Sequence, residues 1–175
     1  MNDDYPYFSF LRLSRSYGIG PQLMQRLLSS YGTADYALDR VLTMPLKHVR
    51  IASKQSILVE IATMEQYQAR YVTFMDEHYP TYLRHISDPP MVLSVLGNPD
   101  LLDTAYIAMV GARAASLPAM QFATLLAGSL KEYRFGVISG LAKGIDGAAH
   151  QGALDVGGRT IAVVAGGVDL SLIHI

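Results

Sequence analysis

The chain has 175 residues, of which 50% are apolar and 17% charged, so it is able to form a packed core and is not a wholly disordered protein. Its 14 Lys and Arg against 15 Asp and Glu give a net charge of -1, which excludes a strongly basic, nonspecific binder of polyanions. The absence of cysteine excludes disulfides, thiol nucleophiles and thiolate zinc sites. The acidic N-terminus and the lack of a long apolar run predict a cytoplasmic protein with no membrane partner.

The first 66 residues have the spacing of helices. Apolar residues recur every three or four positions over 23–28, which predicts a helix with one buried side. Gly32 is suited to end that helix in the left-handed conformation, and Thr33 to cap the next one. A longer helix is predicted over 53–69. Residues 1–66 are therefore expected to form a small all-helical domain.

From residue 67 onward, short apolar runs alternate with amphipathic segments. Strands are predicted over 91–96, 106–110, 135–139 and 160–165, and helices over 116–133 and 146–156. This alternation is typical of parallel βαβ units with right-handed crossovers, so all four strands are expected in one parallel sheet. Fully apolar strands need helices on both faces of the sheet. Residues 67–175 are thus predicted to form part of an α/β, Rossmann-like, doubly wound domain.

Three of these strands run into small residues: Gly111-Ala112-Arg113, Ser139-Gly140-Leu141-Ala142-Lys143-Gly144 and Gly166-Gly167. In doubly wound sheets, ligands bind outside the carboxyl ends of the strands, where glycine allows close approach to backbone amides. Those amides favour an anion such as phosphate. Arg113 and Lys143 are expected to add cations to the same crevice. The alternative is that the glycines only permit tight turns, but three such turns with two cations favour a binding site.

The usual nucleotide motifs are missing. The spacing from Gly140 is G-x-x-x-G-x-x-G instead of G-x-G-x-x-G, and no G-x-x-x-x-G-K-[ST] sequence is present. We therefore expect no nucleotide cofactor.

Asp146 and His150 lie four residues apart on one side of a predicted helix. They either form an acid–base pair or two metal ligands, or Asp146 caps the helix while His150 packs or hydrogen-bonds locally. The absence of a third ligand or a nucleophile nearby favours the second interpretation, with no metal and no catalytic residue.

The turn Gly18-Ile19-Gly20 is similar to the hairpin of helix-hairpin-helix domains, whose amides contact DNA phosphates. Arg15 and Arg26 flank it. In a nearly neutral domain, a turn that serves packing is the favoured interpretation.

Several sequence blocks together resemble the DNA-processing protein A family, also called DprA or Smf. The blocks are Val110-Gly111-Ala112-Arg113-Ala114-Ala115-Ser116, the run from Val137 to His150, Gly152-Ala153-Leu154, Gly157 to Val163, Tyr79-Pro80, Asp88-Pro89-Pro90 and Gly18-Ile19-Gly20-Pro21. The resemblance extends to Asp169. It implies a Rossmann-like domain preceded by a helical domain similar to sterile alpha motif folds.

The resemblance also implies a function without catalysis. Family members bind incoming single-stranded DNA during natural transformation (competence), protect it, and load the RecA recombinase by displacing single-strand-binding protein. Their DNA pocket uses the arginine of the first glycine turn and the Ser-Gly turn after the next strand. Transferred to this sequence, and extended by our own inference to the basic residue that follows, the expected DNA-binding residues are Gly111, Arg113, Ser139, Gly140, Lys143 and Gly144.

After Asp169 the sequence departs from the family pattern. Leu170 to Ile175 stand where family members have a Tyr-Pro pair and then more than a hundred further residues, including surfaces for self-association and RecA contact. We therefore expect a truncated chain whose last six residues are not native, and a family homodimer that does not form through this fragment. The alternative function is that of a nucleotide-phosphate-binding enzyme of the related phosphoribohydrolase fold, whose Pro-Gly-Gly-x-Gly-Thr turn is matched only in part at 165–168.

Overall fold

The computed structural model describes residues 5–44 and 46–167 and forms two compact units, Met1–Gly97 and Asn98–Ile175. Unit 1 contains α1 (Phe8–Ser14), α2 (Pro21–Tyr31), α3 (Ala34–Thr43), α4 (Lys54–Gln66), β1 (Arg70–Thr73), α5 (Thr81–Arg84) and β2 (Val92–Val95). Unit 2 contains a 3-10 turn (Pro99–Leu101), β3 (Tyr106–Ala108), α6 (Leu117–Ser129), β4 (Gly136–Ser139), α7 (Ile145–Asp155) and β5 (Thr160–Ala162). The residues predicted to be non-native, 170–175, lie outside the described part.

Several helix boundaries of unit 1 lie where local sequence signals place them, although α4 ends at Gln66, before the end of the helix expected over 53–69. Gly32 ends α2 with a φ of 78°, and the Thr33 side chain accepts a hydrogen bond from the amide of Tyr36 at the start of α3. Ser53 caps α4 in the same way through the amide of Ser56. These signals are local in sequence, so the caps were predictable.

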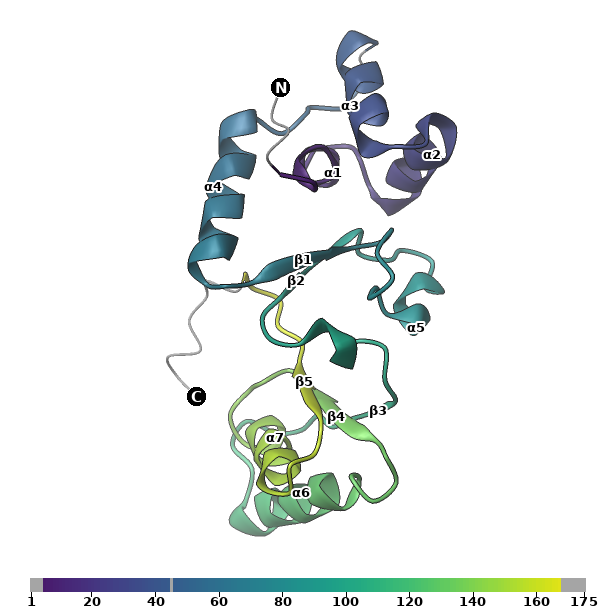
Figure 1. The fold of residues 1–175 in the computed structure, drawn as a ribbon. Helices are drawn as coiled ribbons and strands as arrows, with labels where there is room; N and C mark the ends of the chain where they lie inside the picture. Colours follow the sequence, from purple (N-terminus) through teal and green to yellow (C-terminus); the bar gives the residue numbers. More distant parts are fainter. Residues whose placement is uncertain (1–4, 45, 168–175) are drawn as a thin grey trace. The chain divides into compact units, whose positions relative to one another are not determined.

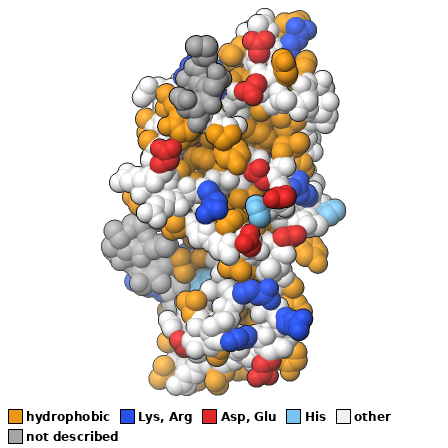
Figure 2. All heavy atoms as spheres, in the orientation of Figure 1, with side chains coloured by type: hydrophobic (Ala, Val, Ile, Leu, Met, Phe, Trp, Pro, Cys, Tyr) orange, Lys and Arg blue, Asp and Glu red, His pale blue; other side chains and the backbone are white. Residues whose placement is uncertain are grey.

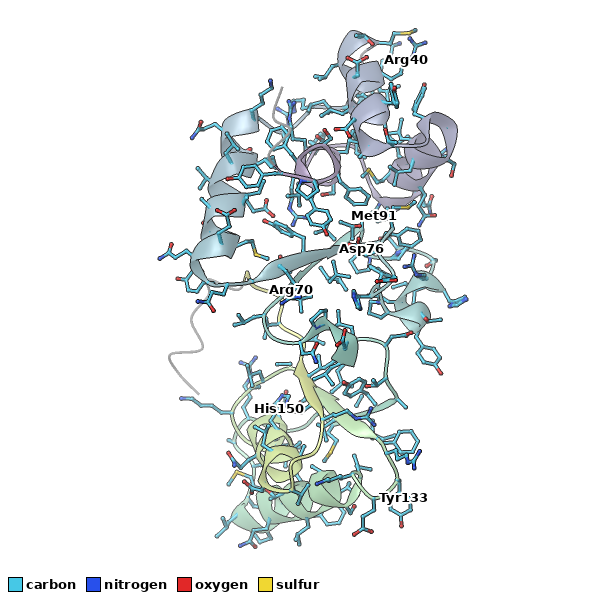
Figure 3. The ribbon with its side chains drawn as sticks, in the orientation of Figure 1. Arg40, Arg70, Asp76, Met91, Tyr133 and His150 are labelled. Atoms are coloured by element: carbon cyan, nitrogen blue, oxygen red, sulfur yellow. The ribbon has the colours of Figure 1, made fainter. Side chains whose placement is uncertain are left out.

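The strand predicted over 91–96 is present as β2, but its expected place in the parallel sheet is wrong. It pairs antiparallel with β1, with Arg70 opposite Val95 and Thr73 opposite Val92. The β1 strand was not predicted, because the helix expected over 53–69 extended to the residue before it, whereas α4 ends at Gln66. Met91, labelled in Figure 3, is 6% exposed and packs into the core formed by α1, α2 and α3. A short apolar run does not reveal whether its partner is parallel or antiparallel.

The β1–β2 pair therefore belongs to unit 1, which is why that unit extends to Gly97. Tyr79 is 1% exposed and donates a hydrogen bond to the carbonyl of Pro90 at 2.7 Å. The Arg84 guanidinium lies over the rings of Phe74 and Tyr79, 5.2 and 5.0 Å from their centroids. The domain boundary between residues 66 and 67 stays a prediction.

Unit 2 contains a three-stranded parallel sheet in the order β3–β4–β5. Because the strands follow one another in sequence order, right-handed crossovers place α6 and α7 on the same face, where the two helices lie side by side (Figure 1). Within the described residues, α6 and α7 are the helices of unit 2 and share one face, so the expected helical cover on both faces is present on one.

Small residues hold the two helices close together and against the sheet. A core of Met109, Ala123, Ala127, Val137, Ala149 and Ala153 fills the layer. At Gly152 of α7, a Cβ would lie 2.1 Å from the carbonyl oxygen of Thr124 on α6, so only glycine permits this approach. The Thr124 hydroxyl donates to the Ala148 carbonyl at 3.2 Å and adds a polar link between the helices.

Candidate functional site

The turn that follows β3 leans on the first residues of α7. A Cβ on Gly111 would lie 2.7 Å from the side chain of Ile145, so glycine is required for this contact. The amide of Ile145 donates to the carbonyl of Ala112 at 3.3 Å. Arg113 comes next in the turn and is exposed.

Gly144 brings the second predicted turn against the first. Its φ is 83° and its ψ is -125°, a conformation that residues with a side chain rarely adopt. A Cβ there would lie 2.3 Å from the carbonyl oxygen of Ala112 and 2.6 Å from that of Arg113. Gly144 is therefore the point at which the backbones of the two turns touch, as expected for two turns at one edge of a parallel sheet.

Ser139 occupies a different position from the one predicted. It is 4% exposed, and its hydroxyl donates to the carbonyl of Met109 at 2.6 Å. The backbone carbonyl of Ser139 accepts from the amide of Val163 at 2.9 Å. The Ser139 side chain is therefore buried and joins the end of β4 to the residue that follows β3. Sequence reasoning placed it in the crevice because it cannot tell which way the last residue of a strand points.

Two of the strand-end amides expected to favour an anion already have a partner within the chain. Asp146 is 6% exposed, and its Oδ1 accepts from the amide of Gly111 at 3.3 Å while its Oδ2 accepts from the amide of Gly140 at 3.2 Å. The N-cap of α7 is Gly144, and Asp146 lies in the first turn of the helix. The interpretation of Asp146 as a local helix cap is thus wrong, because its carboxylate bridges the turns after β3 and β4.

Arg113 and Lys143 are the cations of this edge. Both are exposed, and neither has an ion-pair partner in the structure of residues 5–44 and 46–167. The two lie in turns whose backbones meet at Gly144. Figure 2 shows Lys and Arg side chains on the visible face of unit 2 among acidic and hydrophobic ones, so the positive charge there is local.

His150 has the local role that the sequence favoured. It is 7% exposed, and its Nδ1 lies 2.6 Å from the hydroxyl of Thr160 at the start of β5, so it links α7 to the sheet (Figure 3). Its Nε2 is buried without a hydrogen-bond partner in the described structure. Burial lowers the pKa of His150, and the nearby Asp146 carboxylate opposes that shift only in part. His150 is therefore a neutral packing residue.

Metal binding finds no support at these positions. No group of three or more His, Asp or Glu side chains able to hold a metal ion occurs within the described ranges.

None of the helices in the described part of the chain has the length and apolar character needed to cross a membrane.

The third predicted turn, Gly166-Gly167, is exposed and ends the described part of the chain. Its continuation from residue 168 lies outside the described residues.

The N-terminal hairpin packs against the rest of unit 1. Gly18 has a φ of 84°, and a Cβ there would lie 2.6 Å from the carbonyl oxygen of His48. Ile19 is 6% exposed and belongs to the helical core. Arg15 is engaged in an ion pair with Glu60 at 2.9 Å. Close packing of the backbone thus accounts for Gly18, whereas a Cβ on Gly20 would meet no atom within 4 Å, and the interpretation of the turn as one that serves packing stays a prediction.

A separate hollow of about 410 Å³ lies in unit 1 and is lined by Leu27, Tyr31, Arg40, Val41, Met44 and Leu46. Its lining is mainly apolar and contains none of the residues predicted for DNA. We place the candidate site at the strand ends of unit 2 because the cations and glycine turns are there.

Comparisons with known proteins show which family the chain is similar to. A family model described as DNA recombination-mediator protein A matches residues 70–172, and one described as a DprA-like N-terminal HHH domain matches residues 5–63. The chain is 43% identical over 98 residues to DNA processing protein DprA of Streptococcus pneumoniae, which covers 56% of this chain and 34% of that protein. It is 36% identical over 121 residues to Protein Smf of Escherichia coli, which covers 69% of this chain and 32% of that protein.

The X-ray structure of DNA processing protein A from Streptococcus pneumoniae is similar with a TM-score of 0.70 at 28% identity, covering 96% of this chain and 60% of that one. This similarity confirms the Rossmann-like α/β class preceded by a helical domain. The chain spans less than half of the length of the curated relatives that it matches.

Proposed function

Because the chain belongs to the DNA recombination-mediator protein A family, we propose that the strand ends of unit 2 form part of a site that binds single-stranded DNA. The observation that carries the proposal is the position of Arg113. Its turn follows a parallel strand, rests on the start of α7 and presents an exposed guanidinium with no ion-pair partner among the described residues. An arginine in that position is able to hold a DNA phosphate through two charge-assisted hydrogen bonds.

Lys143 and Gly144 extend this site. Lys143 is a second exposed cation, and it acts as a point charge that attracts the phosphate backbone without fixing its orientation. Gly111 and Gly144 shape the two turns so that their backbones come close together. Ser139 and Gly140 contribute the backbone course of the second turn and not these two groups, since the hydroxyl of one and the amide of the other are already engaged.

The role that we propose for the whole protein is that of a recombination mediator and not of an enzyme. In this role it protects incoming single-stranded DNA in the cytoplasm during natural transformation, displaces single-strand-binding protein and loads RecA. The supports are the family description, the names of the DNA-processing relatives and the absence of the usual nucleotide motifs from the sequence. These steps involve surfaces of the longer relatives, so only the DNA contact is assigned to residues of this chain.

Two assays run side by side test the proposal. A fluorescein-labelled oligothymidine of about 20 nucleotides, long enough for a typical single-strand site, reports DNA binding by anisotropy. Release of base from a nucleoside monophosphate reports the alternative phosphoribohydrolase activity. We expect oligonucleotide binding that weakens as salt rises and no base release. Base release without oligonucleotide binding would overturn the proposal.

A further inference from the structure

Asp146 is a buried carboxylate whose hydrogen-bond partners are backbone amides. One oxygen accepts from Gly111, after β3, and the other from Gly140, after β4. No ion pair of Asp146 occurs within the described residues. A buried carboxylate is costly unless such bonds compensate it, and its place in the first turn of α7 adds a favourable interaction with the helix dipole.

The two amides held by Asp146 are those that would otherwise be offered to a ligand. Strand-end amides at a glycine turn form the phosphate cradle of many Rossmann-like sheets. Here a carboxylate of the chain itself occupies that place, with one oxygen on each turn. Because both donors are used, a ligand phosphate at this edge has to find its donors elsewhere.

We propose that Asp146 is an internal anion that fills the phosphate cradle of this sheet edge and positions the Arg113 turn. It is a positioning residue, since it acts on DNA through the turn after β3. The filled cradle also excludes a free phosphate or a nucleotide phosphate from the two amides. The DNA-binding part of this inference rests on the proposed function, whereas the filled cradle does not.

The surroundings of Asp146 explain why its effect reaches Arg113. Gly111 and Arg113 are separated by one residue, so a bond to the Gly111 amide fixes the start of the turn that carries the guanidinium. The bond from the Ile145 amide to the Ala112 carbonyl fixes the same turn from the next position of α7. Without Asp146, that backbone bond, the packing of Gly111 on Ile145 and the contact at Gly144 remain between the turn and the helix.

The experiment uses three variants of the whole chain. Asp146→Ala removes both acceptors, Asp146→Asn keeps the size but leaves one acceptor oxygen, and Asp155→Asn is the control. Asp155 is an exposed carboxylate at the other end of α7 that accepts from Gln151. Protein labelled with ¹⁵N-glycine reports the amide resonances and hydrogen exchange of Gly111 and Gly140. Oligothymidine anisotropy reports DNA affinity.

We expect faster exchange of both glycine amides in Asp146→Ala, faster exchange of one in Asp146→Asn, and no change in Asp155→Asn. The DNA affinity of Asp146→Ala should fall about tenfold, which corresponds to the loss of one positioned phosphate contact. The DNA affinity of Asp146→Asn should fall by less. In an Arg113→Ala background, Asp146→Asn should have almost no further effect. Inorganic phosphate should shift both glycine resonances in Asp146→Ala and neither in the wild type.

Unchanged glycine exchange and DNA affinity in a folded Asp146→Ala or Asp146→Asn protein would overturn the inference. If Asp146→Ala does not fold, Asp146→Asn carries the same test. If Asp146→Asn lowers DNA affinity equally in the wild type and in the Arg113→Ala background, Asp146 does not act through the Arg113 turn. That result would also overturn the inference. If the wild type binds no DNA, the proposed function fails, while the exchange and phosphate readouts still decide whether the cradle is filled.

Discussion

Gly144→Ala is the substitution that tests most severely how the two turns are joined. Glycine at a φ of 83° and ψ of -125° is close to a region reserved for glycine, and a residue with a side chain there costs roughly 1–3 kcal/mol. The added methyl group would also lie 2.3 Å from the carbonyl oxygen of Ala112, a backbone atom that moves only with its turn. Overpacking of this kind costs about 1–3 kcal/mol more. The expected loss is therefore roughly 2–6 kcal/mol in the free energy of unfolding of unit 2.

Gly147→Ala is the matched control, three residues further along α7. Its methyl group would lie 3.4 Å from the carbonyl oxygen of Ala142, an ordinary contact, inside a regular helix. Alanine in a helix is favoured over glycine by about 0.5–1 kcal/mol, so this variant should be slightly more stable. Urea denaturation followed by far-ultraviolet circular dichroism measures both changes. A Gly144→Ala protein with the same midpoint as the wild type would refute the close approach of the two turns.

Two further substitutions test the structural roles of Ser139 and His150. Ser139→Ala should lower the free energy of unfolding by about 1 kcal/mol, because it leaves the Met109 carbonyl without its donor. It should leave the oligothymidine affinity unchanged. A weaker complex in anisotropy would show that the Ser139 hydroxyl takes part in DNA binding. For His150, burial lowers the pKa in the folded state below the unfolded value of about 6.5. As the pH falls, the unfolded chain therefore takes up a proton before the folded one does. The free energy of unfolding should thus decrease as the pH falls from about 7.5 to 5.5. The urea midpoint of His150→Gln should fall less over that interval than the midpoint of the wild type, and equal slopes would contradict this.

Local signals made much of the fold predictable from the sequence. Ser116 caps α6 through the amide of Ala119, and Gly32 ends α2, because each depends on residues one turn away. The parallel order of β3, β4 and β5 followed from the alternation of strands and helices. The glycine turns of the candidate site were found for the same reason, since each directly follows its strand.

The features that were not predictable depend on partners far apart in the sequence. Asp146 and Gly111 are separated by 35 positions. No local sequence pattern indicates that a carboxylate in the first turn of a helix accepts from an amide in the turn after a different strand. The burial of Ser139 depends on Met109, which directly follows β3 and supplies the acceptor carbonyl. The antiparallel pairing of β1 with β2 likewise joins segments about twenty residues apart, with α5 between them.

The salt dependence of DNA binding by Arg113→Ala tests the central claim most directly. Oligothymidine affinity measured between about 50 and 200 mM salt should fall by about 1–3 kcal/mol relative to the wild type, and the slope of log affinity against log salt should lose roughly one phosphate contact. Arg113→Lys should recover only part of the affinity, because the charge returns without the bidentate geometry. The melting temperature should change little, since Arg113 is exposed. Unchanged DNA binding together with a collapsed melting transition in Arg113→Ala would contradict the account, because Arg113 would then be structural.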